Sequence, residues 1–154
     1  MNLMFWKKKK IDWKKTVLAA VAFTVIAQIT HSLFALIGMD YYLKRAYFPV
    51  WSKLMMPEAG PPPLSFTAYS LLFGFISAMI FAYIYNWIKG CLGGKTPTEK
   101  GLCFGLILFF MSNVPGYLVL VLLINLPLGL IGLWAIEGLL VSLAGGIAIV
   151  KIIG

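Results

Sequence analysis

Four long apolar stretches fill most of this 154-residue chain and constrain its fold more than any other feature. They cover residues 16–39, 66–88, 102–123 and 128–150. Each provides the ~20 residues that a helix needs to cross a hydrocarbon core of ~30 Å. Apolar residues make up 61% of the chain, and the mean hydropathy is +0.92. The sequence therefore predicts an integral membrane protein.

The pattern within the stretches favours helices over strands. Backbone polar groups must be satisfied internally in lipid, so only helices or a closed barrel can span. Barrel strands would alternate in polarity, whereas these stretches are continuously apolar. We predict an all-α membrane protein, folded as one domain over residues 1–154. The expected fold is a four-transmembrane-helix bundle with spans at about 16–39, 66–88, 97–123 and 128–150.

The third span is expected to begin before its apolar stretch, because Thr96-Pro97-Thr98-Glu99 is typical of a helix start. Thr96 would be the N-cap and Pro97 the first helical residue. Glu99 would complete a reciprocal capping box with Thr96. Further along this span, Pro115 removes a backbone hydrogen bond and predicts a kink.

The basic residues are distributed unevenly about the spans. The chain has 13 Lys and Arg residues, five acidic residues and a net charge of +8. Ten of the 13 precede the first span, connect the second to the third, or follow the fourth; the others are Lys44, Arg45 and Lys53. By the positive-inside rule, both termini are expected to be cytoplasmic, in a multi-pass protein of the cell (inner) membrane. The sequence offers no folded basic surface for nucleic acid, so we exclude that partner.

The lysines ahead of the first span also suit contact with anionic lipid headgroups in the bilayer. They are Lys7, Lys8, Lys9, Lys10, Lys14 and Lys15. The connection over residues 40–65 is then expected outside, as an external interfacial segment. Its aromatic residues and few cations suit the headgroup plane, Pro49 is expected to interrupt it, and residues 57–63 are too rich in proline for a helix.

Small residues recur on every span at helical spacing. Between helices in lipid, such residues allow close backbone packing. The predicted packing residues are Ser70, Gly74, Ala78, Ala82, Gly101, Gly105, Gly138 and Ser142. The same surfaces could hold the bundle together or bind another copy of the chain, and the sequence does not separate these uses.

One group of polar side chains within the spans is not needed for helix packing. Glu137 lies about eight residues inside the fourth span, about 12 Å deep, and His31 lies at nearly the same depth in the first span. Gln28 and Asn113 are slightly deeper. A membrane-embedded carboxylate needs a partner, a water cavity or a proton. The sequence thus predicts either a polar-ligand or proton-linked site, or a structural cluster with a protonated Glu137 bonded to Asn113 or a carbonyl.

Motifs for an enzyme are not apparent. The sequence contains one histidine and two cysteines, Cys91 and Cys103, which are too far apart for a C-x-x-C motif. It has no phosphate-binding loop, zinc motif, nucleophile elbow or dinucleotide fingerprint. We therefore expect no metal, no cofactor and no catalytic residue.

Several segments resemble the small, mostly uncharacterised four-helix inner-membrane proteins of bacteria and archaea. These segments are the Lys-rich start, the Trp- and Pro-containing connection, K-G-L-C-F-G-L at 100–106, L-P-L at 126–128 and W-A-I-E-G-L at 134–139. The resemblance covers nearly the whole chain. It implies a four-helix fold and brings no established activity.

These observations favour a non-enzymatic protein that binds, assembles or regulates a membrane partner, which could be a second copy in a homo-oligomer. The alternative is a small transporter or channel-like protein with a site around Glu137 and His31. An enzyme ranks third, because one carboxylate and one histidine suffice for acid–base chemistry but no nucleophile or metal is organised beside them.

Overall fold

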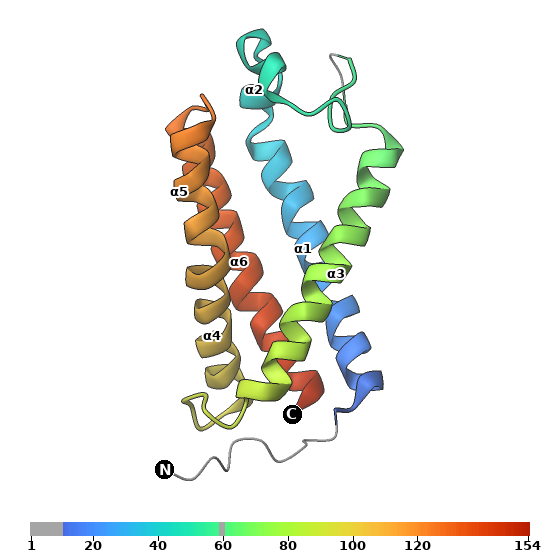
Figure 1. Cartoon of the computed structure of the whole chain (residues 1–154), viewed down its shortest axis with the longest axis vertical. Helices are drawn as coiled ribbons and strands as arrows, with labels where there is room; N and C mark the ends of the chain where they lie inside the picture. Colours follow the sequence, from blue (N-terminus) through green and yellow to red (C-terminus); the bar gives the residue numbers. More distant parts are fainter. Residues whose placement is uncertain (1–10, 59–60) are drawn as a thin grey trace.

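The structure is a computed structural model that describes residues 11–58 and 61–154, and within these ranges it contains helices and no strand (Figure 1). The elements in chain order are α1 (Trp13–Ile37), α2 (Met39–Tyr42), the 3-10 helix η2 (Arg45–Val50), α3 (Leu64–Ile88), α4 (Pro97–Leu108), the π-helical turn η3 (Phe109–Asn113), α5 (Val114–Leu123) and α6 (Leu128–Ile153).

Four helices are long and apolar enough to cross a membrane: α1, α3, α6, and α4–η3–α5, which runs continuously over Pro97–Leu123. The all-helical prediction with four spans is confirmed at this level. The boundaries move by a few residues. α1 begins at Trp13 because the Asp12 carboxylate accepts a hydrogen bond from the Lys15 backbone N–H (3.2 Å), which caps the helix.

The predicted start of α4 is correct, and the Glu99 carboxylate makes one backbone contact more than predicted. The Thr96 hydroxyl accepts from the Glu99 N–H (3.2 Å), as an N-cap should. The Glu99 carboxylate accepts from the backbone N–H of Lys95 (2.7 Å) and also lies within hydrogen-bonding reach of the backbone N–H of Thr96. Gly94 adopts a φ of 124° and folds the preceding turn back against α4, which brings the Lys95 N–H within reach.

The connection between α1 and α3 contains two short helices, α2 and η2. Pro49 lies inside η2 instead of interrupting the segment. Pro49 is the fifth of the six residues of η2, and the φ of about −65° that its ring imposes is compatible with a 3-10 helix.

Helices α4 and α6 approach until their backbones touch, and glycines make this possible. A Cβ atom built on Gly105 would lie 2.5 Å from the Ser142 carbonyl oxygen, and one on Gly101 would lie 2.5 Å from the Ile147 Cα. A Cβ on Gly146 would lie 2.6 Å from the Gly101 carbonyl oxygen. Any larger side chain at these positions would separate the two helices.

Small residues also line the contact between α1 and α3. On α3, Ala78 and Ala82 are fully buried, Gly74 faces the methyl group of Thr24 on α1, and Ser70 is half-buried. Farther along α3, the ring of Tyr85 packs on Phe104 of α4, with centroids 5.2 Å apart. All eight predicted packing residues lie on spanning helices, and Gly138 and Ser142 face the α4–η3–α5 helix.

The two ends of the bundle differ. At one end, which we call the lysine-bearing end, α1 and α4 begin and α3 and α6 finish (Figure 1). Its described lysines are Lys14, Lys15, Lys89, Lys95, Lys100 and Lys151. The opposite end, the loop end, carries the connection from α1 to α3 and the turn from α5 to α6.

The helices also pack differently in the two halves. α1 and α3 cross, so that α3 comes beside α4 at the lysine-bearing end and lies far from α5 at the loop end (Figure 1). We call the half at the lysine-bearing end the closed half; its buried core includes Ala19, Ala20, Phe23, Ala78, Ala82, Tyr85, Phe104, Ile149 and Val150. The other half, which contains His31, Asn113, Tyr117, Trp134 and Glu137, is the open half.

Candidate functional site

The most unusual contact of the open half joins α1 to α6. Glu137 lies about 14 Å along α6 from Leu128, at 1.5 Å per residue. The Nδ1 atom of His31 hydrogen-bonds to the Oε1 atom of Glu137, and the two groups form an ion pair when the imidazole is protonated. Glu137 is buried at 7% exposure, whereas the His31 side chain is 54% exposed. The pair therefore consists of a buried carboxylate and a solvent- or lipid-accessible imidazole.

Asn113 forms a second polar contact, between η3 and α6. Its side-chain amide donates to the Ser142 hydroxyl (2.9 Å) and, at 3.4 Å, to the Gly138 carbonyl oxygen. Pro115 follows two residues later and has no N–H to donate, and the chain before it forms the π-helical turn η3. π-turns of this kind often occur at functional sites. Here the turn ends at Asn113, whose side chain reaches α6.

Two further hydrogen bonds continue the polar contacts toward the loop end. The Tyr117 hydroxyl donates to the Trp134 carbonyl oxygen (2.7 Å), and the Trp134 indole N–H donates to the Tyr42 hydroxyl (2.7 Å). Burial raises the pKa of the Tyr42 hydroxyl, so this group stays protonated at neutral pH. Sequence reasoning missed these three residues. The four-residue spacings from Asn113 to Tyr117 and from Trp134 to Gly138 were the available signal.

An aromatic cluster covers the loop end of these contacts. The rings of Tyr42 and Trp51 lie 5.3 Å apart, and that of Trp134 lies 6.5 Å from Tyr42 and 6.3 Å from Trp51. The cluster packs against Leu130 and Ile131 of α6. Among the described residues, the indole N–H of Trp51 is buried without a hydrogen-bond partner. The connection between α1 and α3 is thus fastened to α6 beside the polar site.

The structure brings together part of the predicted polar site. His31 and Glu137 meet directly, whereas Asn113 bonds to Ser142 and Gly138 and not to Glu137. Glu137 and Asn113 do not pair, since the carboxylate faces α1 and the amide approaches α6 from η3. The ligand or proton site and the structural cluster both stay predictions. Gln28 is half-buried one turn before His31, and no hydrogen bond of its side chain occurs within the described ranges.

The other predicted site residues lie away from this pair. Lys14 and Lys15 are exposed at the start of α1. Lys7, Lys8, Lys9 and Lys10 lie outside the described residues.

Metal-binding and thiol groups are sparse in the part of the chain that the structure describes. It holds no group of three or more His, Cys, Asp or Glu side chains that could bind a metal ion. Cys91 is exposed and Cys103 half-buried, and both are free thiols. The side chains near Glu137 that carry acid–base chemistry are thus His31 and, more weakly, the two tyrosines Tyr42 and Tyr117.

Comparison with known proteins adds no relative. No family model matches the chain, and neither a curated protein nor a solved structure matches it. The resemblance to small four-helix inner-membrane proteins therefore stays a prediction.

Proposed function

We propose that this chain is a non-enzymatic, polytopic integral membrane protein that binds and assembles with a membrane partner through its open half. The partner is another membrane protein or a second copy of this chain. Both termini are proposed to face the cytoplasm from the inner membrane, and lipid surrounds the four helices.

The observation that carries this proposal is the exposure of His31. Polar side chains at hydrocarbon depth almost always face a bundle interior, a water cavity or another protein. Half of the His31 side chain faces none of the described residues, although its Nδ1 atom is held by Glu137. A partner helix that supplies a hydrogen-bond group to Nε2 would remove the cost of leaving this imidazole in lipid.

The rest of the open half supports the same function. Asn113, Tyr117 and Trp134 fix α6 against α5, and Glu137 holds the imidazole in one orientation. A site held this way is preorganised, so partner binding needs little reordering of side chains. Polar contacts of about 0.6 kcal/mol each add specificity to helix association in membranes.

Purification from native membranes in a mild detergent tests the proposal. We expect the wild-type protein to co-purify with a defined protein or as a defined oligomer, visible by native mass spectrometry. Glu137→Leu should reduce the recovered complex at least fivefold, because it releases His31. Gly116→Ala, at a position where an added Cβ meets nothing within 4 Å, should not. A monodisperse single chain without partner would contradict the proposal.

A second candidate, a proton-linked transporter or channel, has one specific observation in its favour. A buried carboxylate paired with an accessible imidazole is an arrangement that can pass a proton between the two groups. In reconstituted vesicles with a pH gradient, Glu137→Gln should abolish proton-coupled flux while keeping the hydrogen bond to His31. Equal flux in the Gln variant and the wild type would remove this candidate.

The proposed orientation can be tested with a native thiol. Cys91 lies exposed in the turn between α3 and α4. In a Cys103→Ser variant, a membrane-impermeant maleimide should label Cys91 only after cells are permeabilised. In a chain lacking both native thiols, Ser52→Cys should be labelled in intact cells. Labelling of Cys91 in intact cells would contradict the cytoplasmic assignment.

A further inference from the structure

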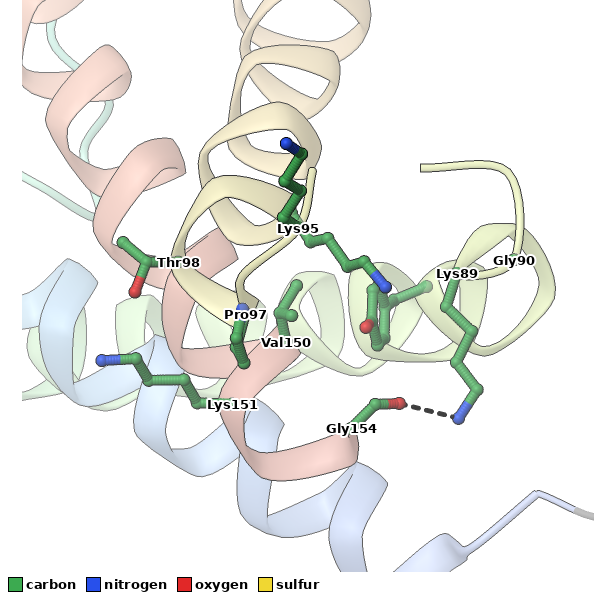
Figure 2. A pocket seen from close by; sticks show the side chains of 10 residues that line it. Lys89, Gly90, Lys95, Pro97, Thr98, Val150, Lys151 and Gly154 are labelled. Carbon is green, nitrogen blue, oxygen red and sulfur yellow. Dashed lines mark hydrogen bonds between the residues drawn. The ribbon is translucent and has the colours of Figure 1, made fainter. Parts of the chain in front are cut away.

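A cavity at the lysine-bearing end is separate from the open half. Its volume is about 590 Å³, and the ends of three helices enclose it. α3 and the turn after it contribute Tyr85, Lys89 and Gly90. The turn before α4 contributes Lys95, and the first residues of α4 contribute Pro97, Thr98 and Lys100. The end of α6 contributes Val150 and Lys151, and Gly154 follows it. Figure 2 shows that Lys89 and Lys151 extend from opposite sides of the end of α6, with Pro97 and Val150 between the helices.

Charge is the chemical signature of this cavity. Four of its ten lining residues are lysines and none has an acidic side chain. Lys89 donates to the Gly154 carbonyl oxygen (3.0 Å), as the dashed line in Figure 2 marks. Within the described ranges, no ion pair engages the ammonium groups of Lys95, Lys100 or Lys151. The neighbouring carboxylate, Glu99, is exposed and turns to the backbone N–H of Lys95.

The position of the cavity along the helices indicates which class of ligand it can bind. α3 ends at Ile88, α4 begins at Pro97 and α6 ends at Ile153, so the cavity lies where spanning helices leave the hydrocarbon core. The buried side chains of Tyr85 and Val150 line the cavity beside the lysines and supply its aromatic and aliphatic surface. A ligand that fits has a multiply charged anionic group attached to an apolar body. Basic pockets between transmembrane helices bind phosphate-bearing lipid headgroups for this reason.

We propose that this cavity binds the phosphate groups of an anionic phospholipid, with Lys95, Lys100 and Lys151 as the principal ligands. Lysine suits this role because its ammonium group lies on a flexible stem and can move to a phosphate oxygen. The site is independent of the proposed partner face around His31, which lies in the other half of the bundle. It requires only that the chain is embedded in a membrane.

The test compares the lipid retained by matched variants in nanodiscs of phosphatidylcholine with added phosphatidylglycerol or cardiolipin at equal lipid charge. Native mass spectrometry should show wild-type protein with bound cardiolipin. The triple variant Lys95→Gln, Lys100→Gln, Lys151→Gln should bind it roughly 100-fold more weakly, since each lysine at an anionic surface contributes about fivefold. Triple replacement by Arg should restore binding, because the charge returns.

Controls separate this site from general charge and from unfolding. The control variant Lys44→Gln, Arg45→Gln, Lys53→Gln removes the same number of charges from exposed residues at the loop end, outside the cavity, and should keep cardiolipin bound. Thermal unfolding of each variant monitors folding. Unchanged retention in the folded triple Gln variant would overturn the proposal. So would equally tight binding of inorganic phosphate to detergent-solubilised protein, which would assign the site to a free anion instead of a lipid.

Discussion

The closed and open halves of this bundle are held together by different physical means. In the closed half, glycines let backbones touch, as at Gly105 against the Ser142 carbonyl, and Ala78 and Ala82 of α3 are fully buried. In the open half, side-chain hydrogen bonds join the helices, as between the Tyr117 hydroxyl and the Trp134 carbonyl. Dispersion contacts between close backbones replace the hydrophobic effect in lipid. We therefore expect the closed half to carry most of the stability, and we propose that the polar groups of the open half serve recognition.

The largest expected effect is at a glycine of the closed half. Gly105→Ala places a Cβ 2.5 Å from a carbonyl oxygen of α6, so the helices must separate. We expect a loss of about 2–3 kcal/mol of stability, typical of overpacking that the backbone must absorb. Thermal unfolding in detergent measures it. Gly116→Ala in α5, where nothing lies within 4 Å, is the matched control; equal losses at both positions would refute the distinction between the halves.

The next largest effect concerns Glu137. Glu137→Leu should cost about 1–2 kcal/mol, since it removes the charge-assisted contact that holds His31. Glu137→Gln should cost clearly less, because an amide can still bond to the imidazole. Thermal unfolding in the same detergent measures the stability loss of both variants. A Leu variant as stable as the wild type would mean that the pair does not hold α1 to α6.

A smaller effect is expected between Asn113 and Ser142. A double-mutant cycle with Asn113→Ala and Ser142→Ala should give a coupling energy of about 0.6 kcal/mol, the average for hydrogen bonds between membrane helices. Such a value would place this contact well below the glycine contacts in stability. A coupling energy larger than the stability loss of Gly105→Ala would reverse the assignment of roles to the two halves.

The smallest effect is expected at Gly132 on α6. An added Cβ there meets nothing within 4 Å, although the residue lies on the same helix as Gly146. Gly132→Ala should change stability by less than about 0.5 kcal/mol, the usual range for an open site. A large loss would show that the open half is packed by a contact not present in the single chain.

The spans could be predicted from sequence because hydropathy is a local property. Each apolar stretch reports its own environment, and TM helices at about 16–39, 66–88, 97–123 and 128–150 match the observed helices within a few residues. The similar depths of His31 and Glu137 in their spans also made it possible to predict that these two residues lie close together. Depth is set by counting along each span, which needs no knowledge of the fold.

The remaining contacts depended on how the helices rotate and cross. Asn113 turns to Ser142 because of the π-helical turn, which hydropathy does not encode. The Tyr42–Trp134 bond depends on a connection that folds back on α6. The additional bond of the Glu99 carboxylate to the Lys95 N–H depends on the fold-back at Gly94. Each of these contacts depends on the tertiary structure, so it could not be predicted from a single sequence.

Site-specific photo-crosslinking in living cells tests the proposed partner face most directly. A photoreactive residue at Ser32, beside His31, is compared with one at Leu18; both are exposed, and 14 residues, nearly four helical turns, separate them on α1. We expect Ser32 to crosslink to protein, either a distinct partner or a second copy of the chain, and Leu18 to crosslink to lipid alone. Lipid adducts alone at Ser32, in membranes where the chain is folded, would contradict a partner at the open half.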